Sequence, residues 1–451
     1  MSDLRLCRSQ CGSPGNLIYV VRIIQNAAAD RPRRIPRFMR KDHHPITAHL
    51  FREAYSDMVA LMTARYGTVW LDDIEDSIQD GLLKAMQTWG YRGVPDNPKA
   101  WLFAVVRNGL VDRMRKSQRF SDQSVPDTGG FQEAFPDARM LADTRLRMVF
   151  ACCHPDLKTE QQLLLALKLV AGFSNAEVAR ALFKKEGTVA RAYTRSKEKL
   201  KAVLDTLEQT HVLALKSRFS VVIRVLYLIF NEGYKPTSGD RVLKHDMCRE
   251  AIRMALSLRE NPVFRHPDLD GLLALMCFHS ARFQARMDEE GGIVDLEHQD
   301  RGLYDRELIR IGERYLREAQ QSEFEPSRYL LEAAVSYLHC QAAAFRDTPW
   351  EAILSLYDSQ LRRAYSPKLA VNRLVALGFV QGADAALDNL EKLGRRFPEL
   401  SLDPLFHAVR GMFLTREGKH PKAAEAYRKA ASLTPNPIEK AHFLRKAEKV
   451  N

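Results

Sequence analysis

Apolar residues recur every three or four positions through most of the chain, which is the spacing of one face of an α-helix. This periodicity covers residues 47–119, resumes over about 137–207, and continues from about residue 214 to the end. Nowhere does the strict alternation of a half-buried strand persist. The pattern therefore predicts an all-α protein.

Two stretches lack this periodicity. Residues 1–45 are basic and are interrupted by prolines, so we expect either a flexible N-terminal arm or sequence upstream of a later start at Met39. Residues 121–136 are rich in Ser, Asp, Gly and Pro, with Gly129 and Gly130 at their centre, which is typical of a linker. These breaks define helical blocks at residues 46–120 and 137–207, followed by a long third block.

The first block contains a helix with two distinct faces. At about 100° per residue, five apolar side chains fall within about 80° of one another and form a narrow stripe: Ile74, Ile78, Leu82, Ala85 and Trp89. Four charged side chains lie opposite: Asp73, Asp76, Asp80 and Lys84. An exposed acidic ridge in a basic protein is either a solvated face or a docking surface for a basic protein partner, since it would repel DNA.

The next helix carries an aromatic ring, an amide and a guanidinium on one face. Trp101, Asn108 and Arg115 recur every seven residues, after a loop that contains Pro95 and Pro98. This combination suits stacking on, and hydrogen bonding to, unpaired nucleic-acid bases. The alternative is that Trp101 only packs at the start of the helix.

The second block predicts a helix-turn-helix. Ser174 and Glu177 form a capping-box pattern that opens a short helix, and a turn at residues 184–187 follows. A further helix is expected from Thr188, and it carries five basic residues: Arg191, Arg195, Lys197, Lys199 and Lys201. A tight turn between a short helix and a strongly basic one is typical of a pair whose second helix enters the major groove of DNA.

Composition narrows the classes of function. The 451 residues carry a formal charge of +12, which favours polyanionic partners. No apolar run reaches the roughly 18–20 residues needed to span a bilayer, so we expect no membrane association. Seven scattered cysteines without metal-ligand spacing predict no metal site and indicate a reducing compartment, the cytoplasm. The sequence has no catalytic or cofactor motif, so we expect no catalytic residues and no cofactor.

Taken together, the first two blocks resemble the extracytoplasmic-function sigma factors of the sigma-70 family. Residues 74–80, Ile-Glu-Asp-Ser-Ile-Gln-Asp, are similar to the Asp-x-x-Gln-Asp/Glu core of region 2.2. Residues 100–108, Ala-Trp-Leu-Phe-Ala-Val-Val-Arg-Asn, continue through Asp112 and Arg115 as regions 2.3 and 2.4 do. Residues 174–200 are similar to region 4.2. The match runs continuously from residue 47 to 207.

The resemblance implies a role for each surface. Region 2.2 grips the clamp helices of RNA polymerase β′, which implies these polymerase-binding residues: Asp73, Asp76, Gln79 and Asp80. Regions 2.3 and 2.4 melt the −10 element and read its non-template strand, which implies these contacts: Trp101, Asn108, Arg115, Lys116 and Arg119. Region 4.2 reads the −35 duplex, which implies these: Lys185, Thr188, Arg191, Arg195 and Lys199. Ala192 stands where many members carry Arg, so the promoter preference of the family does not transfer.

The residues after 207 form an extension, which makes this chain much longer than an ordinary member of the family. Residues 226–234, Leu-Tyr-Leu-Ile-Phe-Asn-Glu-Gly-Tyr, and 298–305, His-Gln-Asp-Arg-Gly-Leu-Tyr-Asp, resemble hallmarks of a group with a helical C-terminal extension. We therefore expect a helical extension over residues 208–320. Over residues 321–451, similar positions recur at 34 and 36 residues: Ile353 and Tyr357, Leu387 and Glu391, Ala423 and Tyr427. This period predicts tetratricopeptide-like repeats with a protein partner, or alternatively an ordinary helical bundle.

These features favour a non-enzymatic sigma factor that binds core RNA polymerase and the −10 and −35 elements of promoter DNA. The extension is expected to regulate it in cis. One alternative is a helix-turn-helix regulator with a protein-binding repeat tail, which would bind duplex DNA without polymerase. Another is a repeat scaffold whose basic helices bind only acidic proteins.

Overall fold

The computed structural model describes residues 44–118, 138–182, 184–205, 215–236 and 244–450. The only β feature within these ranges is an isolated bridge between Met287 and Ile293, and the predicted all-α class is confirmed. No helix in the described ranges is long and apolar enough to cross a membrane. Nearly all of the predicted N-terminal arm, and the whole predicted linker at 121–136, lie outside the described residues.

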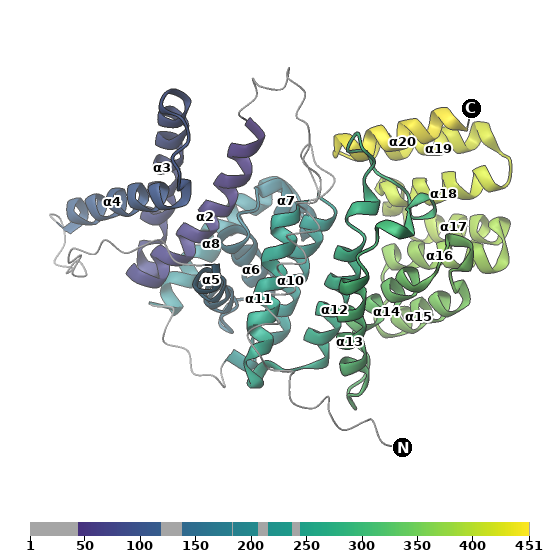
Figure 1. The fold of residues 1–451 in the computed structure, drawn as a ribbon, viewed down its shortest axis with the longest axis horizontal. Coiled ribbons are helices and arrows are strands. Elements are labelled where there is room, and N and C mark those ends of the chain that lie inside the picture. The colour runs from purple at the N-terminus through teal and green to yellow at the C-terminus, as the bar shows by residue number, and fades with distance from the viewer. Residues whose placement is uncertain (1–43, 119–137, 183, 206–214, 237–243, 451) are drawn as a thin grey trace. The chain divides into compact units, whose positions relative to one another are not determined.

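The described residues form two compact units. The N-terminal unit consists of residues 44–229 and 253–264, and the C-terminal unit of residues 230–252 and 265–450. Helices α10 (Phe219–Tyr234) and α11 (His245–Glu260) each contribute residues to both units (Figure 1). The N-terminal unit thus includes described residues that follow position 207, where we expected the helix-turn-helix block to end.

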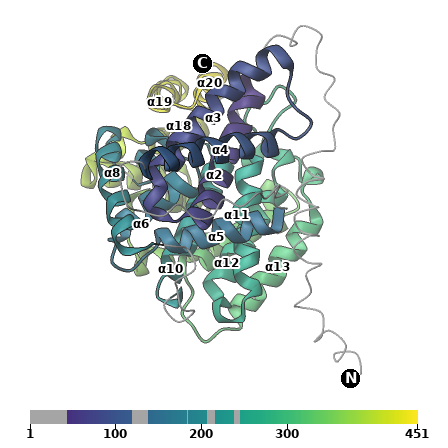
Figure 2. The same cartoon turned by 90° about the vertical axis from the view of Figure 1, so that its left-hand side faces the viewer.

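Three long helices form the first part of the N-terminal unit, and α4 lies across α3 (Figures 1 and 2). A Cβ atom at Gly81 of α3 would lie 2.8 Å from a methyl group of Val106 of α4, so the helices cross closely because position 81 has no side chain. Four of the five residues of the predicted apolar stripe are buried, and Leu82 is half-buried. The elements are α2 (His44–Tyr66), the 3-10 turn η2 (Thr68–Trp70), α3 (Leu71–Arg92) and α4 (Pro98–Gln118).

The predicted helix-turn-helix is formed by α7 and α8. The Ser174 N–H donates to Glu177 Oε2 at 2.7 Å and the Glu177 N–H donates to Ser174 Oγ at 3.2 Å, so the predicted capping box is confirmed. Helix α8 begins at Glu186, two residues before the predicted start, since the Thr188 N–H already donates to the Lys185 carbonyl. The elements are α5 (Ala138–Cys152), α6 (Thr159–Leu165), a π-helical turn (Ala166–Val170), α7 (Asn175–Ala181) and α8 (Glu186–Val203).

Residues from α10 onward complete the core around α5. The ring of Phe150 lies 5.2 Å from that of Phe264, which stacks in turn on Phe219 at 6.0 Å. Arg218 Nη1 donates to the buried carbonyl of Phe150 at 2.8 Å. A chain that ended after residue 207 would lose these contacts, so the N-terminal unit needs part of the extension for its own packing.

From residue 265 the C-terminal unit continues with three helices, and the segment 282–305 with its 3-10 turns joins the first two. A Cβ atom at Gly271 of α12 would lie 3.0 Å from the backbone nitrogen of Leu330 in α14, which shows how closely these two helices approach. Asp305 caps α13 by accepting the N–H groups of Glu307 and Leu308 at 2.9 and 3.0 Å. The helices are α12 (Pro267–Ala281), α13 (Arg306–Gln320) and α14 (Arg328–Gln341).

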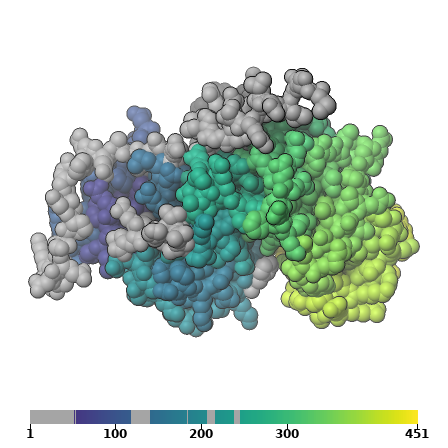
Figure 3. Space-filling view, turned by 90° about the horizontal axis from the view of Figure 1, so that it is seen from below, coloured from purple at the N-terminus to yellow at the C-terminus, as the bar shows by residue number. Residues whose placement is uncertain are grey.

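The last six helices follow the predicted repeat period. Ile353, Leu387 and Ala423 fall on α15, α17 and α19, which is every second helix. A Cβ atom at Gly411 would lie 2.9 Å from the ring of Tyr427, so the small residue lets α18 and α19 pack closely. Successive helices occupy neighbouring zones of the surface, seen as a progression from green to yellow (Figure 3). They are α15 (Trp350–Arg363), α16 (Pro367–Gln381), α17 (Ala383–Arg396), α18 (Pro404–Arg416), α19 (His420–Leu433) and α20 (Pro437–Lys449).

Candidate functional site

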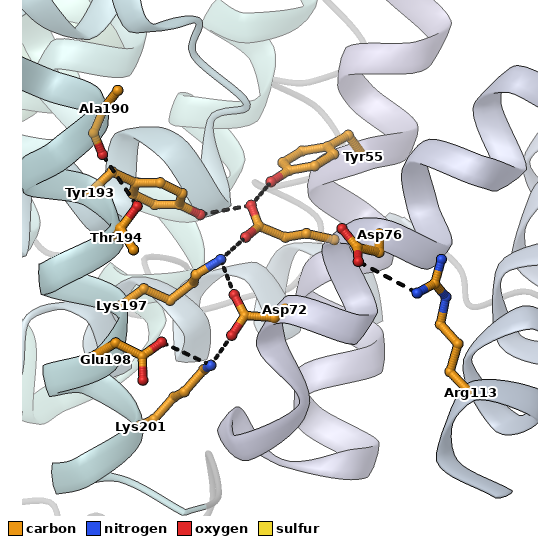
Figure 4. A network of polar contacts seen from close by, with 11 residues as sticks. Tyr55, Asp72, Asp76, Arg113, Ala190, Tyr193, Thr194, Lys197, Glu198 and Lys201 are labelled. Carbon is orange, nitrogen blue, oxygen red and sulfur yellow. Dashed lines mark hydrogen bonds and ion pairs between the residues drawn. The ribbon is translucent and has the colours of Figure 1, made fainter. Parts of the chain in front are cut away.

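The outer face of α3 carries the expected acidic ridge. Asp76, Gln79 and Asp80 are exposed, whereas Asp73 is half-buried. Arg113 of α4 donates to Asp80 Oδ2 at 2.6 Å and to Asp76 Oδ2 at 3.4 Å (Figure 4 shows the contact with Asp76). The hydrogen bond to Asp80 raises the pKa of Arg113. The ridge is thus accessible, and one guanidinium partly offsets its charge.

Helix α4 combines exposed polar groups with a tryptophan that belongs partly to the core. Three of the expected residues are exposed: Asn108, Arg115 and Lys116. Trp101 is half-buried, and its ring centroid lies 5.5 Å from that of Trp89, with 59° between the ring planes. Trp101 therefore packs against α3 while part of its surface stays accessible. Arg119 lies outside the described residues.

One side of α8, which we call its outer face, carries all five residues expected to contact duplex DNA. These residues are all exposed: Lys185, Thr188, Arg191, Arg195 and Lys199. Among the described residues, neither arginine nor Lys199 forms an ion pair on this face. Their positive charge is therefore available to a polyanion, as a helix that enters the major groove requires.

The opposite, inner face of α8 carries two lysines that bind α3 instead (Figure 4). Lys197 Nζ donates to Glu75 Oε2 at 2.5 Å and also contacts Asp72. Lys201 Nζ contacts the second oxygen of Asp72. These two lysines belong to the charge of the predicted basic helix but not to the residues expected to contact DNA, and the helical repeat places them opposite the outer face.

The carboxylate of Glu75 is the centre of this contact. Glu75 is only 9% exposed. Its Oε1 accepts from the hydroxyl groups of Tyr55 in α2 at 2.6 Å and Tyr193 in α8 at 2.7 Å, while Oε2 accepts from Lys197. Burial of an unpaired carboxylate would be costly, and these three donors replace the lost water. One side chain thereby joins three helices.

The pKa values in the network show how the partners stabilise each other. Partial burial acts to raise the pKa of Asp72, but the hydrogen bonds from Lys197 and Lys201 lower it overall. Burial acts to lower the pKa of Lys197, yet its bonds to Asp72 and Glu75 raise it overall. The Asp72 contribution is lost as pH falls, and that of Lys197 as pH rises through its raised pKa. The contact is therefore most stable between these extremes, which includes neutral pH.

The C-terminal end of α8 is fixed to the turn before α3. The Thr68 N–H donates to the Asp205 carbonyl at 3.0 Å, and the Thr68 hydroxyl donates to the Leu204 carbonyl. Gly67 has a φ of +90°, and a Cβ atom there would lie 2.8 Å from the same Asp205 oxygen. Both the backbone conformation and the close approach require glycine.

Ion pairs also join α2 to α4 and α5, and one further pair joins α2 to the helix-turn-helix. The buried carboxylate of Asp57 in α2 accepts from Lys99 at 3.2 Å and pairs with Arg145 of α5 at 2.5 Å. Arg52 of α2 pairs with Glu177 of α7 at 3.0 Å. Together with the α3–α8 contact, these pairs give the outer face of α8 a fixed position relative to α3 and α4.

Sequence reasoning missed this network for an identifiable reason. Asp72 and Glu75 are three residues apart on α3, and Lys197 and Lys201 are four apart on α8, so each pair shares a helical face. These spacings indicate two short stripes of opposite charge. A single sequence does not indicate that the stripes meet, because they lie more than 100 residues apart in the chain.

No group of three or more potential metal-ligating side chains lies together in the described part of the chain. A family model for sigma-70 region 2 matches residues 50–120, which span α3 and α4. A second model, described as a family of unknown function (DUF6596), matches residues 218–320.

Several characterised and uncharacterised proteins are similar to the chain. An uncharacterized protein of Rhizobium meliloti is 33% identical over 381 residues, which cover 83% of this chain and 89% of the relative. The ECF RNA polymerase sigma factor SigL of Mycobacterium tuberculosis is 32% identical over 148 residues, or 32% of this chain and 81% of the relative. SigM of the same organism is 26% identical over 158 residues, or 35% of this chain and 76% of the relative. No solved structure matches. The chain belongs to the extracytoplasmic-function sigma factors of the sigma-70 family.

The central role of Glu75 can be measured directly. We expect Glu75→Gln to lower the free energy of unfolding of the N-terminal unit by about 1–3 kcal/mol, because it removes a buried charge that accepts three hydrogen bonds. Urea-induced unfolding followed by tryptophan fluorescence reports mainly on this unit, which contains Trp70, Trp89 and Trp101, whereas the fourth tryptophan, Trp350, lies in the C-terminal unit. The control Asp80→Asn removes an exposed carboxylate from the same helix and should cost less than about 1 kcal/mol. Equal effects of the two variants would contradict the assignment.

Proposed function

We propose that this protein is a promoter-specificity subunit of bacterial RNA polymerase: a non-catalytic, cytoplasmic sigma factor that directs core polymerase to promoters and starts transcription there. Family membership supports the class, and one observation carries the assignment to this chain. The basic residues on the outer face of α8 are exposed and have no acidic partner among the described residues. The two lysines on its inner face form ion pairs with α3. A scaffold without a nucleic-acid partner would have no need for that separation.

The acidic ridge of α3 is proposed to bind polymerase. Asp76, Gln79 and Asp80 are exposed on one side of the helix, away from the buried stripe. Their negative charge suits a basic protein surface and disfavours DNA. Arg113 forms ion pairs with Asp76 and Asp80 on this ridge. Because these pairs are exposed, breaking them when polymerase binds would cost little free energy.

Promoter contacts are divided between α4 and α8. The accessible part of Trp101, with Asn108 and Arg115 on the same helix, is proposed to capture unpaired bases of the −10 element. Arg191 and Arg195 of α8 are proposed to read the −35 duplex through the major groove. Single-stranded and double-stranded DNA would thus meet different helices of one unit.

Simultaneous contact with both promoter elements requires the N-terminal unit to open. Elements centred 25 base pairs apart lie about 85 Å apart, at about 3.4 Å per base pair. A compact unit of about 200 residues has a radius of gyration of about 17 Å and is about 45 Å across. The arrangement with α8 held against α3 is therefore proposed to be the form that has not engaged a promoter. On opening, the α3–α8 contact and the Arg52–Glu177 pair would both separate.

The extension is proposed to regulate this process in cis, and its repeats to bind a protein partner. Helices α10 and α11 already supply packing to the N-terminal unit, so the extension contributes to the structure that carries the promoter-reading surfaces. The paired helices α15–α20 offer the stacked architecture that protein-binding repeats use. Run-off transcription with purified core polymerase tests the function as a whole, since a polymerase-independent regulator or a scaffold would not change promoter choice.

The proposed polymerase contact can be tested by charge reversal. The double change Asp76→Arg and Asp80→Arg should abolish co-purification with core polymerase, because it reverses the charge of the ridge without touching the apolar stripe. A matched control reverses Asp384 and Asp388, two exposed aspartates with the same four-residue spacing on α17. The control should bind polymerase normally. Normal binding by the folded ridge variant, judged by circular dichroism, would refute the docking assignment.

Substitutions in α8 and in α4 should impair different steps of promoter recognition. Arg195→Ala should weaken binding to −35 duplex by about 1–3 kcal/mol if the guanidinium contacts a base edge, while Arg317→Ala, an exposed arginine of α13, should have no effect. Trp101→Ala should leave duplex binding intact but slow promoter opening, because its ring stacks on unpaired bases. Thermal unfolding must be compared, since Trp101 also packs on Trp89. A normal opening rate in a folded Trp101→Ala variant would assign Trp101 to packing alone.

The opening step can be tested with two neighbouring lysines on opposite faces of α8. Lys201→Gln removes an inner-face ion pair worth about 0.5–1 kcal/mol, so promoter complexes with core polymerase should form about two- to fivefold faster. Its affinity for isolated −35 duplex should not change. Lys199→Gln, on the outer face, should instead weaken duplex binding and bring no gain in rate. Stopped-flow measurement of complex formation separates the two, and an unchanged rate for Lys201→Gln would refute the opening step.

A further inference from the structure

The two hallmark segments of the extension, residues 226–234 and 298–305, have no role in the surfaces described above. Within the C-terminal unit they converge on the end of α12 and the turn that follows it. Tyr234, from the first segment, lies against His279 with ring centroids 4.2 Å apart, and the guanidinium of Arg286 sits 3.7 Å above its ring. Gln299 of the second segment accepts from Arg282 Nε at 3.3 Å.

Three arginines meet where the segments converge, and we call them the arginine cluster: Arg282, Arg286 and Arg301. Arg282 is only 8% exposed, and the other two are half-buried. The acceptors that the structure gives them are neutral. Arg301 Nη1 donates to the hydroxyl of Tyr304, which in turn donates to Gln299 Oε1 at 2.9 Å. Among the described residues, none of the three arginines forms an ion pair.

The carboxylates of the same segments have other partners. Glu232 pairs with Lys244 at 2.9 Å, and Asp300 accepts the N–H of Gly302 at 2.7 Å. Asp305 caps α13, as described above. The positive charge of the arginine cluster is therefore not balanced by these three carboxylates.

Several buried nitrogens in and beside the cluster have no hydrogen-bond partner among the described residues. They are Arg286 Nη1, Arg301 Nε, Arg301 Nη2, His279 Nδ1 and His339 Nδ1. Buried donors in native proteins are almost always paired, and an unpaired group indicates an ion, water or ligand that completes the site. Three of these five atoms belong to guanidinium groups, whose donors require an acceptor.

The pKa values of two nearby histidines reflect the positive electrostatic potential around the arginine cluster. Burial, reinforced by Arg282 and Arg301, lowers the pKa of His339 to about 3. Burial, with Arg282, Arg286 and His339, lowers the pKa of His279 well below its usual value. Both imidazoles are therefore neutral at physiological pH. A neutral imidazole can donate one hydrogen bond without adding to the positive charge of the site.

We propose that the arginine cluster is a binding site for a small oxyanion, the phosphate or carboxylate group of a small molecule. The planar fork of a guanidinium matches the two oxygens of either group, and an anion supplies both the missing charge and the missing acceptors. Burial of uncompensated guanidinium groups is otherwise expensive, and an anion removes that cost. The site joins the two hallmark segments of the extension, and it gives the extension a ligand of its own.

Calorimetric titration of the full chain tests this site. One titrant is sodium phosphate and the other is sodium citrate, each against sodium chloride at the same sodium concentration. We expect a saturable heat with one site per chain and a higher unfolding temperature with the bound anion. Tighter binding of phosphate would identify a phosphoryl ligand, and tighter binding of citrate a carboxylate ligand. If neither anion binds saturably, the proposal is overturned.

Variants locate the binding. Arg301→Gln should weaken it at least tenfold, because Arg301 carries two of the unpartnered nitrogens. Arg286→Lys keeps the charge and removes the fork, so it should weaken binding in a chain whose fold is preserved. The control Arg310→Gln changes a largely exposed arginine of α13 that pairs with Glu307 at 2.8 Å, and it should bind as the unaltered chain does. Equal affinity in all three variants would place the anion elsewhere. The readout is binding alone, so its failure leaves the promoter-reading function untouched.

Discussion

The carboxylate of Glu75 sets the arrangement of the N-terminal unit, because it is buried at a position where three helices meet and every one of them supplies part of its environment. Tyr55 on α2 and Tyr193 on α8 donate to one oxygen, and Lys197 donates to the other. The position of α8 relative to α3 follows from this contact and from the Thr68 bonds at the end of α8. With α8 fixed by its inner face, its outer face has to point to solvent. The accessibility of Arg191, Arg195 and Lys199 is thus a consequence of the contacts on the other side of the helix.

Local features of the sequence were sufficient to predict local features of the structure. The apolar stripe on α3, the capping box at Ser174 and the period that places Ile353, Leu387 and Ala423 on alternate helices depend on residues close together in the chain, whose spacing follows from helix geometry. The exposed candidates on α8 could be found in the same way. The pairing of Asp72 with Lys201 could not, because helical spacing reports on one helix at a time and carries no information about its neighbour. The packing of α10 and the residues that follow it around α5 could not be predicted from the sequence for the same reason.

Buried charges in the described residues have two kinds of surroundings, of which each unit provides an example. In the N-terminal unit, the buried carboxylates of Glu75 and Asp57 each have cationic partners within the chain. In the C-terminal unit, the arginine cluster has only neutral acceptors among the described residues. A charge that the fold pairs internally stabilises one arrangement of helices, whereas a charge left without a counter-ion is a receptor for something outside the chain. The first situation suits a contact that holds surfaces in place, and the second suits a contact that reports the presence of a solute.

The ion pairs between α3 and α8 also make the protein sensitive to the ionic strength around it. Exposed pairs such as Asp72 with Lys201 weaken as added salt shortens the Debye length, which is about 8 Å at physiological ionic strength, while the buried Glu75 pair is screened less. The contacts proposed between α8 and DNA phosphates would weaken with salt as well, and more steeply, because each one releases counter-ions. Salt therefore favours separation of α3 from α8 but disfavours the complex that separation serves. The rate of promoter engagement proposed for this chain should therefore be highest at intermediate salt. A change in intracellular salt, as in osmotic stress, would then alter transcription from its promoters without any further partner or ligand.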